Sequence, residues 1–100
     1  LDRDARRRQR EAEAAERASK LARRRPLARE VAEIEKRIAA LEAERRGLEA
    51  QLADTAFYAA GNVAEVQAAT RRCTEVARLI EAAEERWLAA QSELEAIGEP

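Results

Sequence analysis

Residues 27–52 read LAREVAEIEKRIAALEAERRGLEAQL, and the spacing of their large apolar residues decides the fold. These residues fall at positions a and d of four consecutive heptads, and only Arg45 interrupts them. The a residues are Val31, Ile38, Arg45 and Leu52, and the d residues are Leu27, Ile34, Leu41 and Leu48. Such a repeat places one apolar stripe along one face of an α-helix, where a partner helix covers it. The stretch therefore predicts a coiled-coil helix over about 26–53, and Pro26 is expected at its start or at a kink.

A second heptad pattern predicts another helix over about 62–97. Its a residues are Val66, Cys73, Ile80, Trp87 and Leu94, and its d residues are Ala69, Val76, Ala83, Ala90 and Ile97. The alanines at d allow two helices to approach closely. Asn62 is the expected N-cap, with Glu65 three residues later as its capping-box partner.

The two predicted helices are joined by a short connection over residues 54–61, which includes Gly61. A short connection between complementary stripes favours an antiparallel hairpin, since this arrangement buries both stripes within one chain. The predicted fold is all-α, a two-helix antiparallel coiled-coil hairpin. The second helix is the longer one, and Leu21 is the large apolar residue expected to cover its surplus.

Single residues of the predicted hairpin have more than one interpretation. At the tip, Phe57 closes the end of the seam while Asp54 caps the turn, or Phe57 and Tyr58 form a contact point for a larger partner. Trp87 and Cys73 fit core positions. Arg45 either extends its head out of the seam or meets a glutamate such as Glu75.

The composition excludes several classes of function. The chain has 100 residues, a net charge of -1 and 46% hydrophobic residues, but 25 of those residues are alanine. The remaining large side chains are too few for a globular enzyme core of this length. With no His and the single Cys73, no zinc or transition-metal site is predicted. No apolar stretch suits a membrane span or a signal peptide.

Positive charge is concentrated at the N-terminus. Residues 1–25 contain ten Lys or Arg and five Asp or Glu, whereas residues 26–100 contain nine and fifteen. Arginine clusters suit phosphate contacts, because the guanidinium fork matches phosphate oxygens and each contact releases counterions. The candidate nucleic-acid-binding residues are Arg6, Arg7, Arg8, Arg10, Lys20, Arg23, Arg24 and Arg25, with Arg71 and Arg72 on the second helix. The alternative is a solvated helical linker whose arginines meet only water and nearby glutamates.

The order of these features resembles the C-terminal domain of ABC-F ATPases of the Uup type. The matching features are the heptad helix EIEKRIAALEAERRGLEAQL, the turn motif DTAFY and the EERW sequence of the second helix. The residues that carry the resemblance are Asp54, Phe57, Tyr58, Arg86 and Trp87. It covers about residues 20–97. Thr55 departs from the family pattern, which has proline there, and residues 1–19 look like the basic linker that precedes the domain.

The resemblance implies properties beyond those that the residues predict. Such proteins are cytoplasmic, contain two ATP-binding cassettes and act on ribosomes, and the coiled coil of Uup-like members is implicated in DNA binding. ATP and Mg²⁺ are then expected in the parent protein, whereas this chain has no phosphate-binding loop and no expected cofactor or small-molecule substrate.

Together these observations predict a non-catalytic accessory domain with a basic N-terminal extension, helical or disordered, at residues 1–19 and a hairpin at residues 20–100. Its expected partner is DNA or the ribosome, contacted mainly through phosphates, and its expected state is a monomer with a weak dimer as the alternative. The competing interpretation is a spacer or protein-interaction coiled coil without nucleic-acid affinity.

Overall fold

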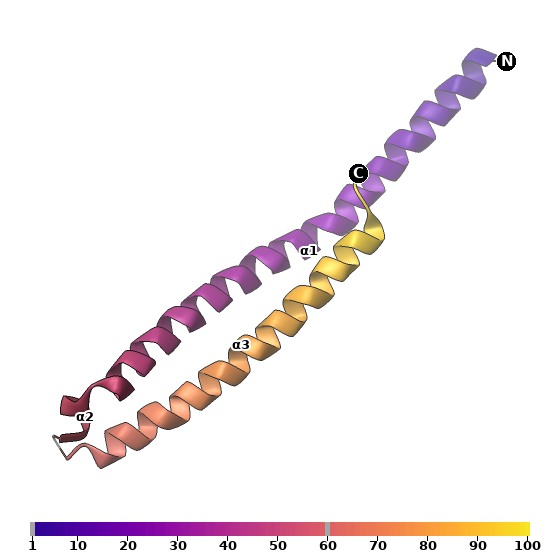
Figure 1. The fold of residues 1–100 in the computed structure, drawn as a ribbon. Coiled ribbons are helices and arrows are strands. Elements are labelled where there is room, and N and C mark those ends of the chain that lie inside the picture. Colours follow the sequence, from indigo (N-terminus) through magenta and orange to yellow (C-terminus); the bar gives the residue numbers. More distant parts are fainter. Residues whose placement is uncertain (1, 60) are drawn as a thin grey trace. The chain divides into compact units, whose positions relative to one another are not determined.

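The computed structural model describes residues 2–59 and 61–100 of the chain, and these residues form three helices. Helix α1 spans Asp2–Ala53, the short helix α2 spans Thr55–Ala59, and α3 spans Val63–Ile97 (Figure 1). The described residues contain no strand, and the fold is the all-α helical hairpin that the heptads predict. Residues 1 and 60, which fall in the expected linker and turn, lie outside the described residues.

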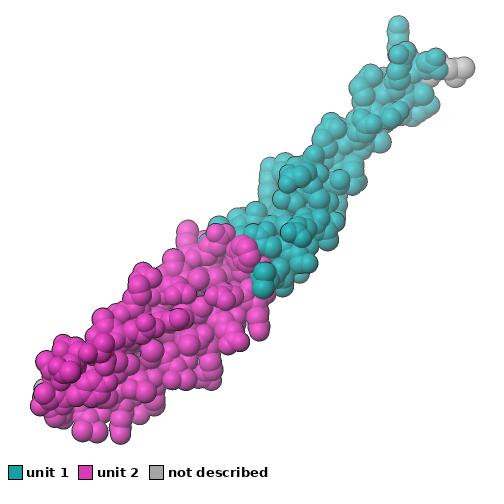
Figure 2. Space-filling model, viewed as in Figure 1, with its two compact units in different colours: residues 1–32, 88–100 teal, residues 33–87 magenta. Residues whose placement is uncertain are grey.

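The chain forms two compact units (Figure 2). Each unit pairs a stretch of α1 with a stretch of α3. Residues 33–87 make one unit, in which α1 and α3 run antiparallel and are joined through α2. Residues 1–32 and 88–100 make the other unit, in which the C-terminal end of α3 is paired with the N-terminal part of α1.

The core of residues 33–87 is a small cluster in the seam between the two helices. Leu41 from α1 and Val76 and Ile80 from α3 are buried, and Leu48 and Leu79 pack against them half-buried. Val76 is fully inaccessible to solvent. Burial of such side chains contributes about 1.5–3 kcal/mol each, so this cluster is the main stabilising element of the unit.

Alanines form the remaining buried layers, as the second heptad pattern predicts. Ala69 and Ala83 are buried in residues 33–87, and Ala90 is buried with Val31 and Leu94 in the other unit. An alanine presents only a methyl group, so the backbones that flank such a layer can approach closely. Every a and d residue that the two patterns assign is buried or half-buried, including Cys73, Trp87 and Arg45.

Helix α1 begins at Asp2, so the expected start of the first helix near residue 26 is wrong. Pro26 lies inside the helix, where it removes one backbone hydrogen bond and disturbs the ladder only locally. The residues before it are rich in alanine, arginine and glutamate, which are strong helix formers. The i,i+4 pair of Arg7 and Glu11 adds a small further stabilisation. Of the two forms expected for the extension, the helical one is found.

None of the described helices has the length and apolar content of a membrane-spanning segment.

Candidate nucleic-acid interface

Most of the candidate basic residues lie on the N-terminal part of α1, where every described residue from 2 to 19 is exposed. The Nε of Arg6 donates to the carbonyl oxygen of Asp2, and the Nε of Arg7 lies 3.6 Å from Oε1 of Glu11. An exposed ion pair such as that of Arg7 and Glu11 contributes about 0–1 kcal/mol, so a stronger anion can displace the Glu11 carboxylate. Arg8, Arg10, Arg23 and Arg25 are likewise exposed, and Lys20 is half-buried.

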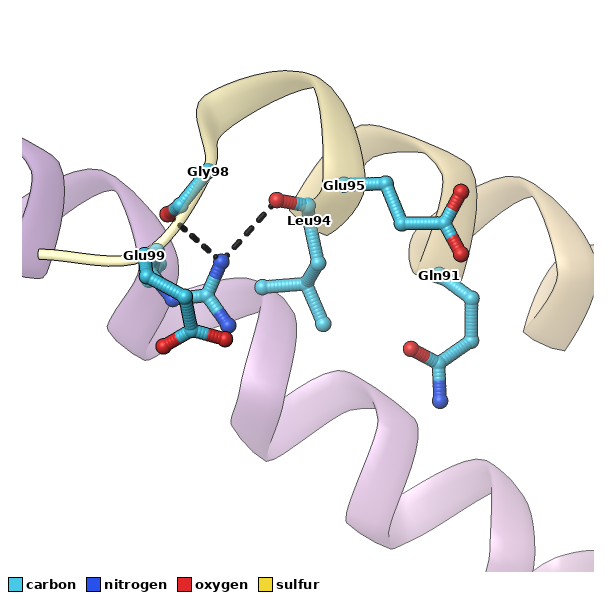
Figure 3. A pocket seen from close by; sticks show the side chains of 6 residues that line it. Gln91, Leu94, Glu95, Gly98 and Glu99 are labelled. Carbon is cyan, nitrogen blue, oxygen red and sulfur yellow. Dashed lines mark hydrogen bonds between the residues drawn. The ribbon is translucent and has the colours of Figure 1, made fainter.

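Arg24 has a structural contact at the C-terminus of α3. Its Nη1 donates to the carbonyl oxygens of Leu94 and Gly98, at 2.9 Å each (Figure 3). The last carbonyls of a helix have no partner within the helix, and a cation there also interacts favourably with the helix dipole. Gly98 adopts a φ of 83°, a conformation that side chains other than glycine rarely adopt, and its N–H donates to the same Leu94 carbonyl.

These bonds place Arg24 where the sequence predicts an apolar partner for the end of α3. Leu21, the expected partner, is 41% exposed, and Arg24 supplies the hydrogen bonds to this helix end. The physical reason is that unpaired carbonyls at the helix end need donors, and a guanidinium supplies them where a leucine cannot. Arg24 also lines an open pocket of about 320 Å³ with Gln91, Leu94, Glu95, Gly98 and Glu99.

Arg72 is bound to carboxylates within residues 33–87. Its Nε and Nη2 donate to the two carboxylate oxygens of Glu44 at 2.5 and 2.9 Å, and its Nη1 lies 3.2 Å from Oε1 of Glu75. The hydrogen bonds from Arg72 hold the pKa of Glu44 below its ordinary value, and those to Glu44 raise the pKa of Arg72. The two hydrogen bonds from the Arg72 guanidinium to the Glu44 carboxylate thus join α3 to α1 across the seam. Arg71, the neighbouring candidate, is exposed.

The Glu44–Arg72 bridge predicts a component of acid lability. The pKa of Glu44 is lowered in the folded protein. As the pH falls, the Glu44 carboxylate is therefore protonated in the unfolded chain before it is protonated in the folded one. The bridge therefore contributes its full stabilisation above the ordinary pKa of 4.5 and loses it as the pH falls through the folded pKa. We expect Arg72→Gln to lower the free energy of unfolding at neutral pH. Between about pH 5 and about pH 3, the variant should then lose less of its free energy of unfolding than the wild type does.

Urea unfolding at several pH values measures this loss. Arg71→Gln is the matched control, since it removes the same charge from an exposed neighbour and should keep the wild-type pH dependence. Equal pH profiles for the wild type and Arg72→Gln would show that the bridge does not act on stability.

The hairpin tip is held by its own side chains. The backbone N–H of Ala56 donates to Oδ1 of Asp54 at 3.0 Å, so Asp54 caps α2 as predicted. The Tyr58 hydroxyl donates to the carbonyl oxygen of Leu52 at 2.8 Å, near the C-terminus of α1. Phe57 is half-buried, and its ring meets that of Tyr58 edge-on with the centroids 6.0 Å apart.

The start of α3 continues this arrangement. Asn62 directly precedes α3, the place expected of an N-cap, and its side-chain amide donates to the carbonyl oxygen of Phe57 at 3.2 Å. Gly61 supplies a φ of 75° in the connection. Asp54 thus has the capping role predicted for it, and Tyr58 leaves half of its surface exposed. The alternative role of the tip as a contact point stays a prediction.

Arg45 and Trp87 complete the residues that the sequence singles out. Arg45 pairs with Glu49 on its own helix, Nε to Oε1 at 3.1 Å, so its head extends out of the seam. Trp87 is half-buried beside an apolar groove of about 330 Å³, whose other lining residues are Glu35, Ile38, Ala39 and Glu84. Among the described residues, no acceptor meets its buried Nε1–H.

The structure thus separates the candidate basic residues into two groups. Arg24 and Arg72 bond groups on the other long helix, whereas the others lie at or near the surface, where Arg6 and Arg7 contact only groups of their own helix. The exposed part of α1 also presents Arg3 and Arg17, which are not among the predicted residues. The heptad register of residues 27–52 would have identified Arg3 and Arg17 if it had been continued toward the N-terminus.

Residues 20–92 of the chain match the family described as the ABC transporter C-terminal domain. No curated protein and no solved structure is significantly similar to the chain. The matched residues include the turn motif and the Arg86–Trp87 pair, and they exclude the exposed part of α1 before residue 20.

Proposed function

Since the chain belongs to the ABC transporter C-terminal domain family and is an accessory domain of an ABC protein, we propose that it binds nucleic acid through arginine–phosphate contacts. The parent protein in this proposal is a cytoplasmic ABC-F ATPase of the Uup type, which binds ATP and Mg²⁺ in its other domains. The accessory domain acts as a monomer, contributes no catalytic residue and contacts DNA or ribosomal RNA.

One observation carries the proposal, the division of charge between the two parts of the chain. The exposed N-terminal part of α1 lies in the segment with ten basic and five acidic residues, and the acidic residues predominate in the rest of the chain. The hairpin core needs none of the arginines before residue 20, because the described residues there are all exposed. A polyanion is attracted to the segment with the excess of positive charge and repelled by the acidic rest of the chain.

The contacts in this proposal go to the backbone of the nucleic acid and are tolerant of sequence. The described residues 2–25 contain no aromatic side chain on which a base could stack. Phosphate contacts fix position and orientation but do not read sequence.

A fluorescent-duplex titration at two salt concentrations tests the proposal. If about five phosphates are neutralised, raising the salt from about 0.05 M to about 0.2 M should weaken binding roughly 500-fold. The same titration with duplex RNA compares the two candidate nucleic acids. Binding that does not weaken as the salt rises, or no binding at the lower salt, would contradict phosphate recognition.

A protein-interaction coiled coil is the second candidate, and the groove beside Trp87 favours it. Two carboxylates, from Glu35 and Glu84, flank an apolar floor there, an arrangement that suits a partner with a basic and an apolar side chain. This candidate would be supported if the chain bound neither duplex and a variant with Trp87→Ala lost a protein partner of the parent.

A further inference from the structure

The net positive charge of the N-terminal segment lies on one face of α1. The heptad register set by Val31 and Leu27 extends toward the N-terminus, since α1 is one helix from Asp2 onward. Its a and d positions between residues 3 and 24 are Arg3, Arg6, Arg10, Glu13, Arg17, Lys20 and Arg24. Six of these seven residues are cations and one is an anion.

The other faces of the same segment are neutral. Outside the a and d positions, residues 1–25 contain four cations and four anions. The cations are Arg7, Arg8, Arg23 and Arg25, and the anions are Asp2, Asp4, Glu11 and Glu16. The entire excess of five positive charges therefore lies at the a and d positions, which a count of basic residues along the sequence does not reveal.

This face is the one that α3 covers further along the helix. Val31 is buried and Leu27 is half-buried, and at Arg24 the helix still binds the end of α3 through Leu94 and Gly98. Before Arg24, the same face continues with Lys20 half-buried and with exposed arginines. We define the cationic stripe as Arg3, Arg6, Arg10, Arg17 and Lys20.

The side chains of the stripe determine which partner it can accept. A further coiled-coil helix is disfavoured, because no a or d position between residues 3 and 24 carries an apolar side chain that two helices could bury. Single-stranded nucleic acid is disfavoured by the lack of aromatic residues. Guanidinium groups on one face of a straight rod match a surface of closely spaced phosphates.

The dimensions of the stripe agree with a duplex. Successive a residues lie about 10.5 Å apart along the helix axis, so Arg3 and Arg17 are about 21 Å apart. One turn of duplex DNA is about 34–36 Å long, and the stripe therefore fits within one turn of an unbent duplex.

We infer that a nucleic-acid duplex lies along the cationic stripe, with Arg3 and Arg17 as contacts beside Arg6, Arg10 and Lys20, while Arg8 and Arg23 lie on other faces of the helix and Arg7 and Arg25 flank the stripe. This inference rests on the proposed function and adds to it the face, the residues and the duplex form of the ligand. Arg24 marks the end of the stripe, because α3 occupies its guanidinium.

Two variants of the 100-residue chain, each lacking four positive charges, test the inference. The stripe variant carries Arg3→Gln, Arg6→Gln, Arg10→Gln and Arg17→Gln. The control variant carries Arg7→Gln, Arg8→Gln, Arg23→Gln and Arg25→Gln. Arginine and glutamine have similar helix propensities, and far-ultraviolet circular dichroism verifies that both variants keep the helix content of the wild type.

The readouts are affinity for a fluorescent 20-base-pair DNA duplex and its dependence on salt. We expect the stripe variant to bind about tenfold more weakly or worse at 0.1 M salt, and the slope of log affinity against log salt to become shallower by about 3.6. The control variant should keep most of the wild-type slope and stay within about threefold of its affinity, since its substituted side chains lie outside the stripe.

Other results would overturn the inference in distinguishable ways. Equal losses in the two variants would show general electrostatic attraction, which leaves the proposed function standing without the stripe. Wild-type affinity in both variants would place the site elsewhere on the chain. A wild-type chain that binds no duplex would overturn both the inference and the proposed function. The same conclusion would follow if the stripe bound a polyglutamate peptide and did not bind the duplex.

Discussion

Replacing Leu41 with alanine is expected to destabilise the chain by about 2–5 kcal/mol. Leu41 is 6% exposed and clusters with Val76 and Ile80, the other buried residues of the seam core. The substitution removes apolar contacts and leaves a cavity that two paired helices refill only in part. Since small domains have a total stability of only about 5–15 kcal/mol, the loss is a large fraction of it.

Urea unfolding followed by circular dichroism measures this effect. Leu88→Ala is the matched control, because it makes the same substitution at a position of α3 that is 62% exposed, and its effect should stay within about 0.5 kcal/mol. If the two variants were equally stable, the cluster around Val76 would not be the core of the fold.

Replacing Ala90 with leucine is expected to destabilise the chain by about 1–3 kcal/mol. Ala90 has no exposed surface and lies in one of the alanine layers of α3, in the unit that also buries Val31 and Leu94. A larger side chain must force the helices apart or adopt a strained rotamer. The alanine therefore acts as a spacer that sets how closely the helices approach.

Ala89→Leu provides the matched control for this substitution. Ala89 directly precedes Ala90 in the same helix and is exposed. Since leucine and alanine both have high helix propensity, Ala89→Leu should change the stability only slightly. Thermal unfolding of the two variants gives the comparison. A stabilised Ala90→Leu variant would mean that the layer contains unfilled space and that close approach does not explain the alanines.

The heptads predict most of the fold, because periodic apolar residues act through a simple geometric rule. The stripes at Leu27 to Leu52 and Val66 to Ile97 place each a and d residue on the buried side, and the structure buries or half-buries all of them. The capping role of Asp54 is likewise local, since its side chain bonds the backbone two residues further on.

Features that depend on contacts between distant residues could not be predicted in this way. Arg24 bonds carbonyls that are 70 and 74 residues away, and no local pattern marks those partners. The ion pair of Arg72 and Glu44 joins α1 to α3. The heptads do not determine how far one helix is shifted along the other, so they could not predict this pair. The position at which α1 starts depends on a balance between two free energies. The helix propensity of residues 2–25 favours a helix through Pro26, and the backbone hydrogen bond lost at Pro26 opposes it.

The candidate site shows the same division between local and distant information. The sequence predicts a basic segment, but a list of its clustered arginines includes Arg24, which α3 occupies, and omits Arg3 and Arg17. Once the helix is known to continue from the hairpin to Asp2, the heptad register selects the face that carries the charge.

Amide chemical-shift changes across the whole chain, measured by NMR as a 20-base-pair DNA duplex is added, show directly whether the duplex binds along the cationic stripe. We expect the largest changes between residues 3 and 20, at the stripe positions and their neighbours, and no change in the seam core around Val76. Changes centred on the hairpin tip at Phe57 and Tyr58, or none at low salt, would contradict this expectation.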